Sequence, residues 1–96
     1  MNTRLLHTEP INQASGFQGI IQLQRNANLI LVSVKQGGLD VWFGDCRGNL
    51  PSVPHLHYGQ TNAPVWVPIP EGCFHLTYLT IGPPSPVLAC ILVGGV

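Results

Sequence analysis

The stretch LILVSVKQGGLDVWF, residues 29–43, decides the fold class of this 96-residue chain. Residues 29–35 are rich in β-branched side chains, which is typical of a strand in the core of a sheet. The glycine-containing segment 36–38 predicts a hairpin turn, because glycine accepts the positive φ that such turns require. Residues 39–43 then read as the return strand, with three apolar side chains on one face: Leu39, Val41 and Phe43.

Strand patterns separated by Gly and Pro turns continue on both sides of this stretch. Residues 17–24 alternate between apolar and polar side chains. Residues 55–58 predict a short strand, and the prolines around 65–69 predict an edge strand. Residues 87–93, VLACILV, are apolar on both faces, so this strand is expected to be central or covered by a partner. Residues 74–80 also alternate, with three side chains expected to point inward: Phe74, Leu76 and Tyr78.

No segment of the chain shows a convincing helical period. About six to eight short strands in so few residues predict an all-β single domain, either a small β-sandwich or a jelly-roll-like barrel. Residues 1–15 show no strand period and are expected to form an extended N-terminal arm. The β-sandwich domain is then expected to span residues 16–96.

Charged side chains are scarce. Four basic and four acidic residues give a net charge of zero and make up 8% of the chain, against roughly 25% in a typical soluble domain. A monomer normally covers its surface with mixed charge, so we expect another molecule to cover much of this one. No apolar run approaches the ~20 residues that cross a bilayer, the N-terminus lacks the apolar stretch of a signal peptide, and the dispersed basic residues argue against nucleic acid. Protein remains the expected partner.

Three histidines form a pattern typical of a metal site. His55 and His57 make an H-x-H pair, and His75 closes a P-x-G-x-x-H run. Cupins, which are jelly-roll proteins, hold a metal with similar motifs, and imidazoles suit zinc, copper, iron or nickel. However, the glutamate of the cupin motif is missing, and the alternation of residues 74–80 directs His75 out of the barrel. We therefore expect half-exposed strand histidines, with no metal and no cofactor.

Other catalytic arrangements have less support. Cys73 and His75 lie two residues apart on one strand face, which is close enough for a dyad, but no third group that would orient the histidine is evident. The acidic residues form no obvious pair, and no nucleophile elbow or phosphate-binding loop is present. The sequence predicts that the protein is not an enzyme.

Taken in order, the segments VWFGD, VWVPI, FHLTYL and VLACILV resemble the small β-sandwich virion proteins of bacteriophages that decorate or cement capsids. The resemblance covers residues 28–93. It implies a structural virion protein, assembled in the host cytoplasm, that binds the major capsid protein or another virion protein. It also implies a homo-oligomer, with a trimer favoured.

The residues expected to make these contacts are apolar side chains of the arm and of the last strand, together with both tryptophans: Leu5, Leu6, Trp42, Trp66, Ile91, Val93 and Val96. For each tryptophan a core position stays an open alternative. Two other functions also stay open. An exposed Trp66 can stack on a sugar, as in a lectin-like, carbohydrate-binding module of a phage tail or fibre, and the histidines leave a minimal cupin-like metal protein as the third possibility.

Overall fold

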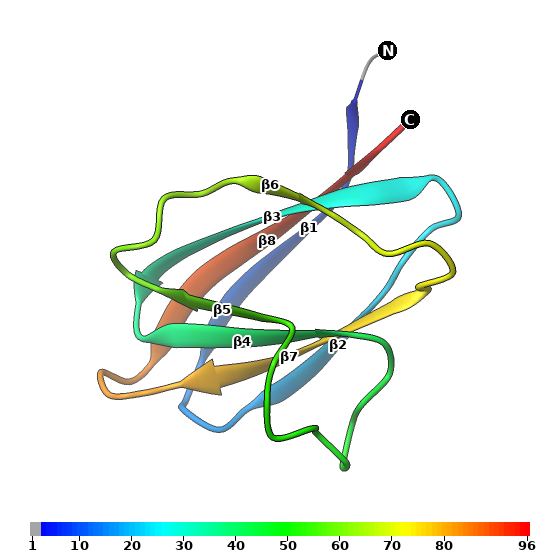
Figure 1. The fold of residues 1–96 in the computed structure, drawn as a ribbon. Coiled ribbons are helices and arrows are strands. Elements are labelled where there is room, and N and C mark those ends of the chain that lie inside the picture. The colour runs from blue at the N-terminus through cyan, green and yellow to red at the C-terminus, as the bar shows by residue number, and fades with distance from the viewer. Residues whose placement is uncertain (1–2) are drawn as a thin grey trace.

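The computed structural model describes residues 3–96, and these form eight β-strands (Figure 1). The predicted all-β fold is confirmed. Among the described residues there is no helix long and apolar enough to cross a membrane. The strands are β1 (Arg4–Gln13), β2 (Gln18–Gln22), β3 (Ala27–Gln36), β4 (Gly38–Phe43), β5 (Leu56–Gly59), β6 (Trp66–Pro68), β7 (His75–Ile81) and β8 (Val87–Gly95).

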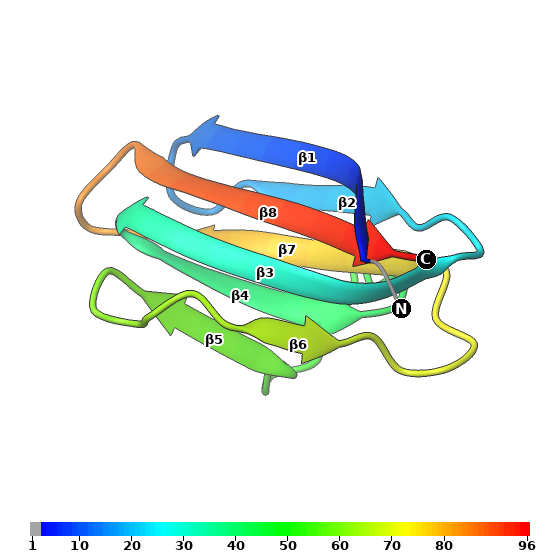
Figure 2. The same ribbon diagram turned by 90° about the horizontal axis from the view of Figure 1, so that it is seen from above.

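The strands pair in two four-stranded antiparallel sheets, with orders β1-β8-β3-β6 and β2-β7-β4-β5. Seen from above, the first sheet lies over the second (Figure 2). The chain changes sheet at every connection except the one between β4 and β5. This is the strand order of an eight-stranded jelly roll, a sandwich with protected edges.

The glycine turn at 36–38 is not a hairpin. β3 and β4 both form where the sequence predicts strands, but they belong to different sheets. Gly37 has a φ of 83° and makes the corner at which the chain leaves one sheet for the other. A Cβ at Gly37 would lie 2.8 Å from a methyl carbon of Val87 and 2.9 Å from the carbonyl oxygen of Ile81. The corner therefore requires glycine for its backbone angle and for its packing.

The core lies between the sheets and is mostly aliphatic. The side chains facing it alternate along each strand, as the sequence pattern predicts. Phe74 is an exception: it is exposed, because β7 begins only at His75. The core side chains include Ile30, Val32, Ile91 and Val93 from the first sheet and Ile21, Leu39, Val41, Tyr58, Leu76 and Tyr78 from the second.

The N-terminal segment is a strand of the sandwich, so the predicted arm over residues 1–15 is wrong for residues 4–13. β1 pairs with β8 from Arg4 to Gln13, with a β-bulge between Leu5 and His7. Residues 1 and 2 lie outside the described residues. Glu9 anchors β1 to the second sheet, because the Tyr78 hydroxyl donates to its carboxylate at 3.2 Å. Burial, followed by the charge of Glu9 and this hydrogen bond, raises the pKa of Tyr78 to about 12.

Candidate interaction surface

The outer side of the β1-β8-β3-β6 sheet is apolar and open to solvent. Because Ile30, Val32 and Ile91 point into the core, their strand neighbours point outward. Four of these eight neighbours on β3 and β8 are leucines, and each leucine is half-buried. We call this surface the open face: Leu5, Thr8, Pro10 and Asn12 of β1, Leu88, Cys90, Leu92 and Gly94 of β8, Leu29, Leu31, Ser33 and Lys35 of β3, and Trp66 and Pro68 of β6.

Trp66 lies across one end of the open face. It pairs with Leu31 in the sheet, yet its indole reaches over β3 to Gly94 on β8, where a Cβ would lie 3.2 Å from a ring carbon. The indole is 41% exposed. Beside it is a hollow of about 460 Å³, lined by Thr3, Arg4, Leu5, Leu29, Trp66 and Leu92. An indole held over a glycine beside a leucine-lined hollow is suited to contact with another apolar surface.

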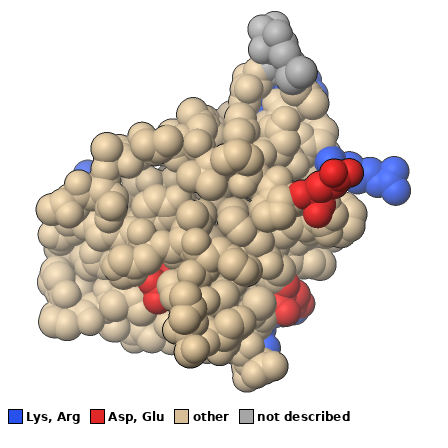
Figure 3. Space-filling view, in the orientation of Figure 1, with Lys and Arg blue, Asp and Glu red and all other residues tan. Residues whose placement is uncertain are grey.

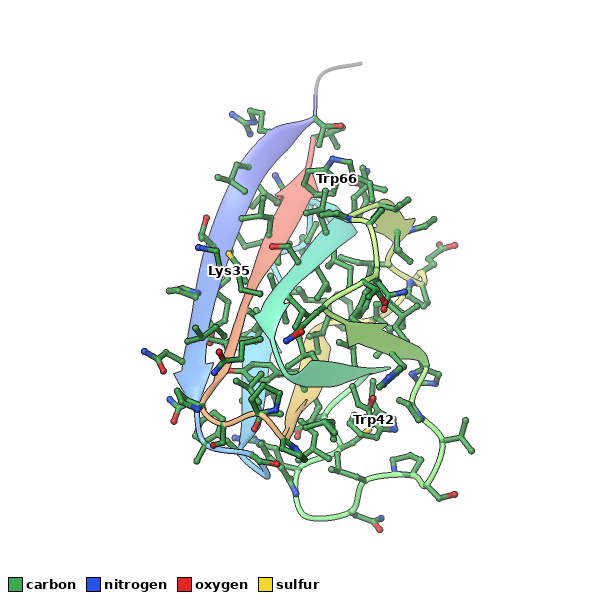
Figure 4. All side chains as sticks on the ribbon, turned by 90° about the vertical axis from the view of Figure 1, so that its left-hand side faces the viewer. Lys35, Trp42 and Trp66 are labelled. Atoms are coloured by element: carbon green, nitrogen blue, oxygen red, sulfur yellow. The ribbon has the colours of Figure 1, made fainter. Side chains whose placement is uncertain are left out.

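A second hollow lies towards the other end of the open face. It measures about 420 Å³ and is lined by Ile11, Ser33, Lys35, Leu88, Ala89 and Cys90. Lys35 is the only charged residue among the strand positions of the open face, none of which is acidic, and Arg4 adds a second cation at the hollow beside Trp66. Figure 4 shows Lys35 and Trp66 well separated along the first sheet. Burial, and then the charge of Glu9, raises the pKa of Cys90, so its thiol stays protonated at neutral pH.

The outer side of the β2-β7-β4-β5 sheet is different, because the connection over residues 44–54 covers part of it. We call this side the covered face. The buried Thr77 hydroxyl donates to the Gly44 carbonyl at 2.7 Å and accepts from the Cys46 amide at 2.9 Å. The Gly48 amide reaches the side chain of Gln18 at 3.3 Å. Trp42, which also faces this side, is only 2% exposed, and Figure 4 places it beside this connection.

The structure divides the predicted contact residues. Leu5, Trp66 and Val96 are exposed, and Leu5 and Trp66 meet at the same hollow. Leu6 is half-buried in the bulge of β1 and packs towards Gly95. The contact role predicted for three others is wrong, because their side chains are buried within the chain itself: Trp42, Ile91 and Val93.

Most residues of the open face are absent from the contact set that the sequence predicts, although the sequence contains a signal for them. β3 and β8 are apolar on both sides, so either alternating set could have faced inward. Apart from alanines such as Ala89, the apolar side chains of β3 and β8 that face the core are β-branched, whereas the outer set contains Leu29, Leu31, Leu88 and Leu92. β-branched side chains fit a pleated, buried surface well, and this preference could have identified the leucines as the outer set.

The three histidines lie on the covered face or beside it. The Nδ1 atom of His55 accepts a hydrogen bond from the Phe43 amide at 2.9 Å, and the imidazole stacks on the Phe43 ring. His57 bonds to Asp40 across the β4–β5 pair, and His75 alternates with the inward Leu76. Within residues 3–96 no three His, Cys, Asp or Glu side chains are grouped closely enough to hold a metal ion. The predicted outward direction of His75 is confirmed, and the geometry of a cupin centre is absent from these residues.

Cys73 and His75 do not form the activated pair that a dyad requires. The Cys73 thiol donates to the backbone carbonyl of His75 at 3.0 Å, not to its ring. Burial raises the pKa of Cys73, which disfavours the thiolate. Both residues line a shallow hollow with Phe74 and Gly72. This hollow therefore offers no activated nucleophile.

Comparison with protein-family models, with curated proteins and with solved structures finds no match for this chain.

Proposed function

We propose that the chain is a structural, non-enzymatic protein that acts by binding other proteins, and that its assembly is a phage virion in which it decorates or cements the capsid. The observation that carries this proposal is the open face, an outer sheet surface built from leucines, a tryptophan and a single charged side chain. A sheet surface of this composition is typical of an interface core, which is poor in charge and rich in aromatic and aliphatic groups.

The charge distribution supports the same proposal. Figure 3 shows one face of the molecule, on which the few charged groups are separated by wide uncharged areas. The ion pairs on the covered face are local, such as that of Asp45 with Arg47 at 3.0 Å. This leaves few free charges to keep a monomer soluble. The resemblance of four strand segments to capsid decoration proteins is what makes a virion the proposed location.

Carbohydrate binding is the second candidate, because Trp66 is exposed and could stack on a sugar ring. Sugar sites add several hydrogen-bonding groups to such an aromatic platform. The hollow beside Trp66 offers only Thr3 and Arg4 as polar side chains, against Leu5, Leu29 and Leu92. This lining favours an apolar partner over a sugar.

The proposal is tested on particles released by the organism from which the chain comes. These particles are banded on a density gradient, and the chain is quantified in each fraction by mass spectrometry against the major capsid protein. We expect a fixed ratio of the two proteins in DNA-filled particles, and earlier release of DNA on heating when the gene is deleted. A chain found only in soluble fractions would contradict the proposal.

A further inference from the structure

We propose that the open face binds a second copy of this chain in a two-fold dimer, with Lys35 of each copy lying over Trp66 of the other. The inference rests on the proposed function in one respect, that the chain acts through protein contacts. It adds the occupant of the surface and the symmetry of the contact. It also replaces the trimer expected from the sequence.

The sheet edges are poor sites for a partner, which leaves the face. β1 carries a bulge and Pro10, and both features hinder the addition of another strand. β6 has three residues and contains Pro68. In the second sheet, the edge strands β2 and β5 have five and four residues. A partner is therefore expected to pack on side chains and not to extend a sheet.

The open face is large enough for a specific contact between two copies. Three long strands and the short β6, spaced about 4.8 Å apart and about 30 Å long, present about 500 Å² of projected area. Two copies then bury about 1,000 Å² in total, which is the lower bound for a specific interface. The other large exposed apolar side chains on residues 3–96 lie outside this face: Phe17, Val53, Val65, Phe74 and Val96.

One contiguous surface favours a pair over a ring. A two-fold dimer uses the same patch on both copies, whereas a three-fold ring needs two different patches on each chain. Apolar members of the open face are direct neighbours in one sheet, such as Leu31 of β3 beside Leu92 of β8. The exposed apolar side chains elsewhere stand singly on loops and strand ends.

The position of Lys35 on β3 indicates the direction of the two-fold axis. Lys35 lies four residues beyond Leu31, the residue that pairs with Trp66, and four residues of strand span about 13 Å. An axis along the strands would bring the two Lys35 side chains together, with no acid between them. An axis across the strands near Ser33 separates them and sets each Lys35 over the partner's Trp66, where the ammonium group can interact with the indole face.

The same axis brings the two Cys90 residues together. Cys90 pairs with Ser33 in the sheet and points outward from β8. An axis that crosses β3 near Ser33 also crosses β8 near Cys90, so the two thiols lie close to each other across the interface. Cys90 therefore serves as a chemical reporter of this arrangement.

Self-association is measured by sedimentation velocity and by native mass spectrometry at neutral pH. The protein concentration is varied from about 1 to about 100 µM, a range in which a weak to moderate dimer dissociates measurably. We expect a dimer whose Kd rises about 30-fold or more in Trp66→Ala and in Leu92→Glu, as for central interface residues. Lys35→Ala should raise Kd by about 3-fold, and Lys35→Arg should preserve it. Val53→Glu, in the connection over the covered face, is the matched control and should leave Kd unchanged. The circular dichroism spectrum of Trp66→Ala should match that of the wild type, because the substitution alters an exposed side chain.

In a background that carries Cys46→Ser and Cys73→Ser, a short bifunctional thiol reagent at alkaline pH should link two chains through Cys90, and it should fail to link chains that also carry Cys90→Ser. A monomer at all concentrations, a trimer, or a dimer that is insensitive to both Trp66→Ala and Leu92→Glu would overturn the inference. So would an oligomer that is linked equally well without Cys90. A monomer that still bands with particles would refute the dimer and leave the proposed function intact, whereas a dimer never found in particles would do the reverse.

Discussion

The outer sides of the two sheets differ in what covers them. On the covered face, the chain itself supplies residues 44–54, tied down by Thr77 over Trp42. On the open face, Trp66 and the leucines of β3 and β8 stay accessible. Both sheets carry a tryptophan on the outer side, and only one of these has an intramolecular cover. The difference shows that an outward apolar side chain becomes buried or stays accessible according to whether a connection of the chain covers it.

The largest effect should separate the two tryptophans. Trp42→Ala removes a side chain that is 2% exposed, which costs about 3–5 kcal/mol of unfolding free energy. The cost should fall near the lower end, because the Trp42 indole N–H is buried without a hydrogen-bond partner. Trp66→Ala should cost less than about 1 kcal/mol in the monomer. Urea unfolding below the association concentration measures both, and equal costs would refute the distinction between the faces.

The cover itself can be loosened without touching either tryptophan. Thr77→Val keeps the shape of the side chain but leaves the Cys46 amide and the Gly44 carbonyl without their partner, which should cost about 1–3 kcal/mol. Hydrogen exchange at Cys46 should accelerate strongly, while exchange in β3 and β8 changes only with global stability. Thr77→Ser keeps the hydroxyl and is the control. Unchanged exchange at Cys46 in Thr77→Val would mean that the threonine does not hold the cover.

The sequence predicts the strands of the two sheets better than it predicts which sheet each strand joins. Strand positions and the jelly-roll-like architecture could be predicted, because alternation and Gly/Pro turns are local signals. Sheet membership could not, and Gly37 illustrates why. A two-residue hairpin and a corner between sheets both require a positive φ, and only the packing against Val87 and Ile81 distinguishes them.

The candidate surface was predicted in part for a related reason. The sequence predicts contact roles for Leu5, Trp66, Ile91 and Val93, with a core position as an alternative for Trp66. Leu5 and Trp66 are exposed, but the outward residues of β8 include Leu88 and Leu92, not Ile91 and Val93. On a strand that is apolar on both sides, hydropathy alone does not show which set faces inward. Likewise, the sequence predicts an arm where β1 forms, because an edge strand with one buried side and a bulge has no clear period.

The stability of the core between the two sheets should depend on alkaline pH, because the Tyr78 hydroxyl lies between the sheets. Its pKa is raised to about 12 in the folded protein from 10.0, so the neutral hydroxyl favours folding. This contribution is complete below pH 10 and is lost as the pH rises from 10 to 12, by roughly 1–2 kcal/mol. Tyr78→Phe should lack this part of the decline.

The pKa values of Tyr58, Cys73 and Cys90 are also raised by burial, so the test is the difference between wild type and Tyr78→Phe, measured by urea unfolding from pH 8 to 12. Leu92→Glu should show the wild-type decline, because its substitution lies on the open face. A changed decline in Leu92→Glu would show that the variant perturbs the core, and its loss of association could then not be assigned to the surface.

The smallest effect tests whether the open face is free to move. At Gly94 a Cβ would lie 3.0 Å from a methyl carbon of Thr3 and 3.2 Å from the Trp66 ring. Both neighbours are exposed side chains that can shift outward. Gly94→Ala should therefore change the unfolding free energy by no more than about 0.5 kcal/mol, since the reduced chain entropy of the unfolded state offsets the crowding.

The control is Gly95, the next residue, where a Cβ would overlap the backbone carbonyl of Asn26. This carbonyl cannot move aside, so Gly95→Ala should be strongly destabilising. Urea unfolding followed by tryptophan fluorescence measures both variants, and the Trp66 signal should shift in folded Gly94→Ala. If the two substitutions destabilise equally, Trp66 is held as rigidly as backbone, and the open face is a fixed part of the core layer.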